Sequence, residues 1–161
     1  MNARAEERAG EGAYELAITR SFDAPPALVY RLWSQREHMI RWWGPKDFTC
    51  TALEMDFRVG GRWRACIRSA QRGASWMGGV YREIEPERRL VFTFAWEDGR
   101  DQPGVETLVT VTFEAAAGRT LQSFHQAPFV RREGRDDHLK GWGSVFESEN
   151  DYLRGLAGAG S

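Results

Sequence analysis

A stretch near the C-terminus, residues 136–156, constrains the fold more than any other part of the chain. At about 100° per residue, its apolar positions fall on one stripe that includes Trp142 and Leu153, while Lys140 lies on the opposite side. Roughly 20 helical residues span about 30 Å, which is enough to cross a small domain. We therefore predict one long amphipathic helix that crosses the structure formed by the preceding residues.

The residues before this helix read mostly as strands, because apolar and polar side chains alternate in them. Short turns connect the strands, so neighbouring strands should be antiparallel. Two short helices are expected after the first strand, one around residues 28–33 and a second that starts after Ser34 and runs through Trp43. We predict an α+β domain in which a curved sheet of about six to seven strands wraps around the long helix. The expected strands are residues 14–22, 48–57, 62–68, 76–84, 90–96, 105–113 and 120–126.

The length of 161 residues favours a single domain, which we place at residues 13–157. The charged, Gly-rich residues 1–12 and the last residues, 158–161, are expected to be flexible tails. The net charge of -1 argues against binding to nucleic acid or to anionic lipid. No apolar run reaches about 18 residues, and the N-terminus lacks the apolar core of a secretory signal. We therefore expect a cytoplasmic protein that does not enter a membrane.

The motifs typical of cofactors, metals and catalysis are absent from this sequence. Cys50 and Cys66 lie in separate predicted strands, and with three scattered histidines they form no zinc-binding spacing. We expect two buried free thiols, since a reducing compartment disfavours a disulfide. The sequence also lacks a nucleophile elbow, a metalloprotease motif, a phosphate-binding loop and a dinucleotide fingerprint. We predict no cofactor, no metal and no catalytic residue.

Seven tryptophans in one small domain indicate either a large aromatic core or an aromatic-lined cavity. The inner face of the predicted sheet and the stripe of the long helix should bring these rings together. Two interpretations remain open, a closed core and a partly open pocket of a few hundred Å³. If the pocket exists, we expect it to be lined by Trp43, Trp63, Phe92, Phe94, Trp96, Val109, His125, Trp142, Phe146 and Glu149.

Glu149 is the unusual member of this set, because it lies in the centre of the apolar stripe of the long helix. A carboxylate in a dry core is costly unless it is paired or neutralised. His125, placed on the inner face of the last strand together with Leu121, and His138, at the start of the helix, are the candidate partners. The carboxyl group could reach solvent past the rim, form a structural buried pair, or take part in proton transfer.

Two local features bear on access to such a pocket. Gly141 and Gly143 flank Trp142 inside the helical pattern, where each costs about 1 kcal/mol relative to alanine, so we expect sheet or ligand to approach the helix there. Trp42 and Trp43 cannot point in the same direction on a short helix. We therefore predict one ring in the core and one near the mouth of the pocket, where an exposed ring would also suit a protein interface.

Six short sequences that follow one another along residues 22–153 point to a family. They are Phe22-Asp23-Ala24-Pro25, Arg41-Trp42-Trp43-Gly44-Pro45, Gly60-Gly61-Arg62-Trp63, Glu85-Pro86, Arg89-Leu90-Val91-Phe92-Thr93-Phe94 and Gly141-Trp142-Gly143. Together they resemble the START/Bet v 1-like (SRPBCC) superfamily, and within it the bacterial group called activator of heat-shock-protein-90 ATPase homologue 1-like. The resemblance implies the helix-grip fold.

The resemblance implies several functions, because one fold hosts many sites. Superfamily members bind lipids, hormones or polyketides between sheet and helix, and a few are cyclases or hydrolases. Our first hypothesis is a non-enzymatic protein that binds a small hydrophobic ligand. The second is a protein-interaction domain that acts on a chaperone in a stress response, like the co-chaperone that gives the group its name. A cyclase or hydrolase ranks last. Sheet edges that need covering are compatible with a homodimer.

Overall fold

The computed structural model describes residues 14–97 and 106–159. The tail predicted at 1–12, most of the loop predicted at 97–104, and residues 160 and 161 lie outside the described residues. No helix within the described ranges is long and apolar enough to cross a membrane. In chain order the elements are β1 (Tyr14–Phe22), α2 (Pro26–Ser34), α3 (Arg36–Met39), β2 (Thr49–Met55), β3 (Arg62–Ser69), β4 (Gly73–Glu85), β5 (Arg89–Trp96), β6 (Thr107–Ala116), β7 (Arg119–Phe129) and α4 (Arg132–Ala159).

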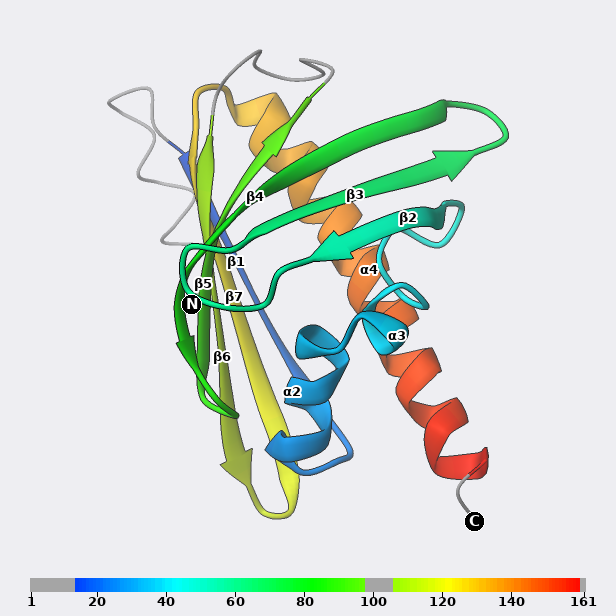
Figure 1. Cartoon of the computed structure of the whole chain (residues 1–161), viewed down its shortest axis with the longest axis vertical. Coiled ribbons are helices and arrows are strands. Elements are labelled where there is room, and N and C mark those ends of the chain that lie inside the picture. The colour runs from blue at the N-terminus through cyan, green and yellow to red at the C-terminus, as the bar shows by residue number, and fades with distance from the viewer. Residues whose placement is uncertain (1–13, 98–105, 160–161) are drawn as a thin grey trace.

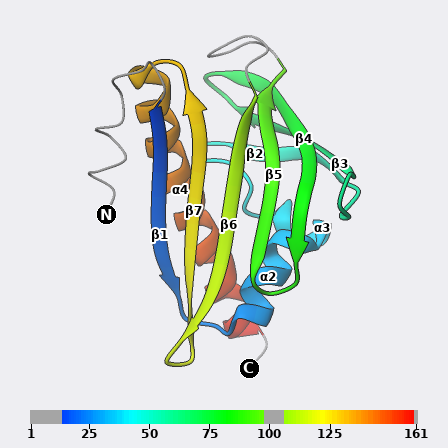
Figure 2. The same cartoon turned by 90° about the vertical axis from the view of Figure 1, so that its left-hand side faces the viewer.

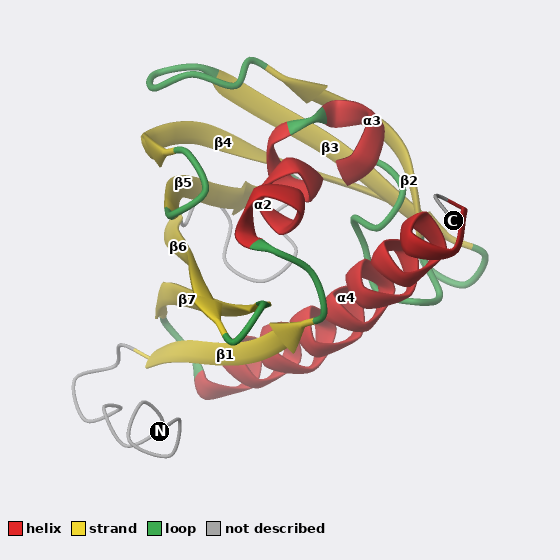
Figure 3. Ribbon diagram, turned by 90° about the horizontal axis from the view of Figure 1, so that it is seen from below, coloured by secondary structure: helices red, strands yellow, loops and turns green. Residues whose placement is uncertain are grey.

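The strands form one antiparallel sheet of seven strands in the order β1-β7-β6-β5-β4-β3-β2. Figure 3 shows that the sheet curves into a deep arc and that α4 runs across its open side, from the β1 edge towards the β2 edge. Figure 2 shows the other face, where β1, β7, β6, β5 and β4 lie side by side with the helices behind them. The predicted α+β helix-grip fold is confirmed, and α4 begins earlier and ends later than the 136–156 predicted.

Helix α2 fills the hollow of the arc, and its Trp33 is the centre of the core. Trp33 is 1% exposed, and its ring lies 4.9 Å from the Trp42 ring and 6.3 Å from that of Phe146, measured between centroids. Phe124, on the inner face of β7, lies 6.5 Å away on another side. Apolar side chains from the sheet, α2 and α4 therefore meet around one indole, and this part of the interior is closed.

Strands β4 and β5 approach each other closely beside the side chain of Trp63. The Trp63 indole N–H donates to the backbone oxygen of Thr93 over 3.0 Å, and the Thr93 hydroxyl accepts the Val80 N–H over 2.8 Å. A β-carbon on Gly79, which pairs with Trp63 across the strands, would lie 1.8 Å from that same Thr93 oxygen. The absence of a side chain at Gly79 thus allows the close approach of the two strands beside the indole hydrogen bond.

Cys50 and Cys66 are buried and unpaired, as predicted. Burial raises the pKa of the Cys50 thiol to about 11, so its reactive thiolate is scarce at neutral pH. Among residues 14–97 and 106–159, no group of three or more histidine, cysteine or acidic side chains is arranged to hold a metal ion. Both cysteines therefore act as small core residues.

Two glycine-to-alanine variants test the close approach at Gly79. Gly79→Ala should lower the free energy of unfolding by about 3 kcal/mol or more, because the new methyl group meets backbone that cannot move aside. Gly141→Ala, in the middle of α4, meets no atom within 4 Å and should raise it by about 0.5–1 kcal/mol. Urea denaturation measures both values, and similar stabilities for the two variants would contradict the close approach at Gly79.

Candidate functional site

The main cavity lies beside the first half of α4, where β3 and β4 extend past the helix (Figure 1). It has a volume of about 560 Å³. The ends of β3, β4 and β5, the first half of α4 and the loop between α3 and β2 supply its walls. The cavity therefore lies at one end of the domain, next to the closed core around Trp33 rather than inside it.

Four of the aromatic side chains that line this cavity contact one another and form its apolar wall: Trp43, Phe94, Trp96 and Trp142. The ring centroids of Trp43 and Trp142 are 5.4 Å apart, and those of Phe94 and Trp142 are 5.8 Å apart. Phe94 also contacts Trp96 edge to face at 5.5 Å. The four rings thus form one continuous surface that joins α4 to β5 and to the segment after α3.

Hydrogen bonds inside the protein fix the Trp142 ring. Its indole N–H donates to Gln126 Oε1 over 2.8 Å, and Gln126 Nε2 donates to the Thr107 hydroxyl over 2.8 Å. The Thr107 hydroxyl donates in turn to the backbone oxygen of Phe94 over 3.1 Å. This chain of three bonds links the Trp142 ring to the backbone of β5 at Phe94, so the orientation of the Trp142 ring is set before any ligand arrives.

The Trp96 ring is fixed through His138. Its indole N–H donates to His138 Nε2 over 2.9 Å, and His138 Nδ1 lies 2.8 Å from the backbone oxygen of Gly134. Because an indole N–H can only donate, Nε2 is the acceptor and the imidazole hydrogen is on Nδ1, where it bonds to the Gly134 oxygen. His138 also lines the cavity, and it is held at both ring nitrogens.

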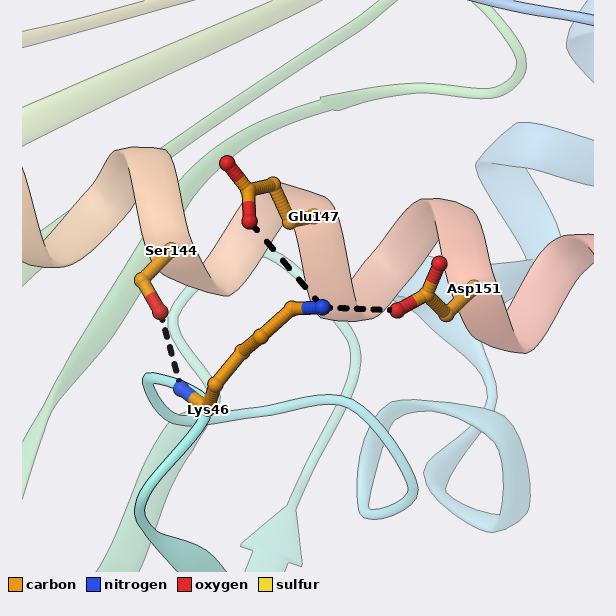
Figure 4. A network of polar contacts seen from close by, with 4 residues as sticks. All are labelled: Lys46, Ser144, Glu147 and Asp151. Carbon is orange, nitrogen blue, oxygen red and sulfur yellow. Dashed lines mark hydrogen bonds and ion pairs between the residues drawn. The ribbon is translucent and has the colours of Figure 1, made fainter.

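The loop between α3 and β2 is attached to α4 by Lys46 (Figure 4). The Lys46 backbone N–H donates to the Ser144 hydroxyl over 2.8 Å, and its ammonium group lies 3.0 Å from Asp151 and 4.0 Å from Glu147. The hydrogen bond and the charge of Asp151 raise the pKa of Lys46. Residues on both sides of Lys46, including Pro45 and Phe48, line the cavity, so this contact holds one of its walls in place.

The mouth of the cavity carries charges of both signs. Asp47 from the loop, Arg72 from the turn between β3 and β4, and Asp137 and Lys140 from α4 all line the cavity and are exposed. The interior wall, in contrast, is aromatic and apolar. A bound molecule would therefore meet charged groups only near solvent.

Of the ten side chains predicted to line a pocket, Trp43, Phe94, Trp96 and Trp142 line this cavity. Four others, Trp63, Phe92, Val109 and Phe146, are at most 4% exposed and belong to the closed core around Trp33. Lining residues that the prediction missed include Phe48, Ile67, Met77 and His138. Alternation along their strands does place Ile67 and Met77 on the inner face, but no sequence signal shows where that face is left uncovered.

The inner face predicted for β7 is wrong. The buried side chains of this strand are Thr120, Gln122, Phe124 and Gln126, whereas Leu121 is only partly buried. His125 lies on the outer face, where its Nε2 is 2.6 Å from a carboxylate oxygen of Glu15. It therefore neither lines the cavity nor contacts Glu149.

Glu149 is fully buried, so the interpretation that it reaches solvent is wrong, and neither His125 nor His138 is its partner. Trp33 Nε1 donates to one carboxyl oxygen over 3.1 Å and Gln122 Nε2 donates to the other over 3.0 Å. Burial raises the pKa of Glu149 to about 8, against the opposing effect of these two hydrogen bonds. The geometry is that of a structural buried group, and Glu149 does not line the cavity.

Trp42 and Trp43 separate as predicted, with Trp42 in the core and Trp43 lining the cavity, but neither ring is exposed. Trp42 is 2% exposed and donates its N–H to the backbone oxygen of Leu32, and Trp43 is 3% exposed. Neither of these two tryptophans is therefore exposed to serve a protein interface.

The two glycines beside Trp142 have different surroundings. A β-carbon on Gly143 would lie near a side-chain nitrogen of Arg20, whereas a β-carbon on Gly141 would meet no atom within 4 Å. Gly141 lines the cavity, so the missing side chain leaves space in the cavity and does not bring the sheet closer to the helix.

Comparison with known proteins agrees with this architecture. The family model for "Activator of Hsp90 ATPase homolog 1-like protein" matches residues 23–153. A solved protein of Chromobacterium violaceum is 25% identical, with a TM-score of 0.78 over 85% of this chain and 94% of that chain. The AHSA1 protein of Silicibacter pomeroyi is 23% identical, with a TM-score of 0.77 over 87% of this chain and 97% of that one. No curated protein matches the chain.

The buried carboxyl group predicts an unusual dependence of stability on pH. The folded-state pKa of Glu149, about 8, is above the ordinary value of 4.5, so between these values the folded state binds more protons than the unfolded state. The Glu149 contribution is thus fully present below about pH 4.5 and is lost as the pH rises towards about 8. The loss should be on the order of a few kcal/mol.

Thermal or urea unfolding between about pH 5 and about pH 8 measures this effect. Glu149→Gln should remove the fall, so its stability relative to the wild type should rise with pH. Glu147→Gln, on an exposed neighbour whose side chain is 58% accessible, is the matched control and should follow the wild-type profile. If the stability of the wild type and of Glu149→Gln changed with pH in the same way, the pKa of Glu149 would not be raised by burial in the folded state.

Proposed function

This chain belongs to the family of activator of Hsp90 ATPase homolog 1-like proteins, and we propose that it binds a small apolar or aromatic molecule without transforming it. The proposed site is the cavity beside the first half of α4. Its volume of about 560 Å³ lies in the range of about 300–1,000 Å³ that is usual for small-molecule sites. The observation that carries the proposal is the continuous aromatic wall of this cavity.

The state of the wall before binding supports the proposal. The Trp142 ring is oriented through Gln126, and the Trp96 ring is oriented through His138. Side chains that are already ordered lose little conformational entropy when a ligand contacts them, and this favours affinity. Aromatic rings also offer a large contact area to a planar apolar molecule.

Glu149 and His138 are not placed for acid–base catalysis, and this favours binding over a cyclase or hydrolase activity. The other titratable groups of the cavity, Asp47, Asp137 and Lys140, lie at its exposed mouth. Acid–base catalysis requires a proton donor or acceptor within hydrogen-bond reach of the substrate. Glu149 is enclosed by Trp33 and Gln122 and does not line the cavity. His138 does line it, but its two ring nitrogens are engaged by Trp96 and by the backbone oxygen of Gly134.

The alternative function, a domain that regulates a chaperone ATPase through protein contact, draws on the name of the family. An interface of this kind is usually anchored by exposed aromatic side chains. Trp42 and Trp43, which were its candidates in this sequence, are both buried. Ligand binding therefore remains the better-supported function.

A variant that fills the cavity tests the proposal. A β-carbon on Gly141 meets nothing within 4 Å and lies at the cavity wall, so the ring of Gly141→Phe can occupy the space meant for the ligand. We expect the wild type to bind the neutral fluorophore N-phenyl-1-naphthylamine, with fluorescence enhancement, and Gly141→Phe to bind it at least about tenfold more weakly. Such a loss corresponds to about 1.4 kcal/mol.

Gly155→Phe is the matched control, because it adds the same ring to an exposed position of α4 outside the cavity. It should bind the fluorophore as the wild type does. Equal weakening by both variants would mean that the ring disturbs the helix rather than fills a site. A wild type that binds neither this fluorophore nor any compound of an aromatic and lipid thermal-shift library would refute the proposed function.

A further inference from the structure

Trp43 differs from the other interior tryptophans in its indole N–H. Five indole nitrogens donate hydrogen bonds within the protein, those of Trp33, Trp42, Trp63, Trp96 and Trp142. Within the described parts of the chain, the Trp43 N–H has no such acceptor, although the residue is only 3% exposed. Trp76, whose N–H also lacks a bond, is only partly buried and lies under the Arg64 guanidinium at 3.9 Å.

The Trp43 N–H opens onto the main cavity. Across the described residues, no fully enclosed side-chain nitrogen or oxygen lacks a partner, so this nitrogen must reach the small surface that Trp43 retains. Trp43 borders two spaces, the main cavity and a void of about 10 Å³. The void exposes carbon atoms only. A donor on a side chain that is 97% buried therefore points into the cavity proposed as the binding site.

The direction of this donor is fixed. The Trp43 ring contacts the rings of Trp33, Trp63 and Trp142 in edge-to-face arrangements, at centroid distances of 6.1, 5.6 and 5.4 Å. A donor held in this way needs no reorganisation when an acceptor arrives. Its hydrogen bond would be left unmade by a pure hydrocarbon, at a cost to affinity.

We propose that the ligand is a neutral carbonyl compound with an aromatic or alicyclic body, and that its carbonyl oxygen accepts the Trp43 N–H at the inner end of the cavity. This inference rests on the proposed function. A carboxylate suits the inner end less well, because it would lose its hydration in exchange for one uncharged donor. The cations that line the cavity, Arg72 and Lys140, are exposed at its mouth and are available there to any polar tail.

Two probes of one shape separate this inference from the proposed function. 2-Acetylnaphthalene and 2-isopropylnaphthalene share a skeleton and differ in the carbonyl oxygen. In ¹⁵N-labelled protein with assigned indole resonances, we expect both to bind, the ketone roughly three- to tenfold more tightly, as one net hydrogen bond allows. The ketone alone should shift the Trp43 indole proton downfield, while the Trp96 indole, already bonded to His138, should lack that ketone-specific shift.

Trp43→Phe should abolish the advantage of the ketone, and Trp76→Phe, on the outer surface, should preserve it. If Trp43→Phe does not fold, the shift of the wild-type indole proton still decides the question. Equal binding of both probes with an unchanged Trp43 indole would overturn the inference and leave the proposed function intact. If neither probe perturbs the residues that line the cavity, the proposed function fails and the inference fails with it.

Discussion

The need to give each buried indole N–H an acceptor shapes the interior of this protein. An indole ring contributes a large apolar area, but its N–H loses water on burial and has to be compensated. The acceptors come from different sources: Gln122 and Glu149 for Trp33, the backbone oxygen of Thr93 for Trp63, and Gln126 for Trp142. The positions of polar groups in the core thus follow from the positions of the tryptophans.

This constraint explains where prediction from the sequence succeeded and where it failed. The stripe of α4 and the inner faces of β3 and β5 are apolar, so periodicity located them, and the helix-grip arrangement followed. On β7 the inner face carries Gln122 and Gln126, which serve the indoles, while the outer face carries Leu121. Alternation of apolar residues therefore predicts the wrong inner face for β7 and places His125 on it. Only the number of tryptophans, each in need of an acceptor, hinted at a polar inner face.

The position of the cavity could not be predicted for a different reason. Strand alternation tells which side chains face inward, but not which part of the inner space another element fills. Here α2 inserts Trp33 into the hollow and closes it, so Phe92, Val109 and Phe146 became core residues. The end of the domain beside the first half of α4 stays open, partly because a glycine stands at position 141 and because Lys46 fixes a loop at the rim. Both features depend on contacts between residues far apart in the sequence, so no local sequence pattern predicts them.

The same constraint divides the interior into two regions with different roles. Around Trp33, the polar atoms are paired with one another, and the cost of burying Glu149 is a matter of stability. Towards the open end, Trp142 and Trp96 still have internal acceptors, but Trp43 has none among the residues that the structure describes. The other interior indole N–H groups have acceptors within the protein, and the Trp43 N–H faces the cavity instead. The folded protein therefore lacks one hydrogen bond that it could have formed. Such a loss is most readily maintained where an external acceptor makes that bond, which argues that this end of the domain is organised for recognition rather than for folding.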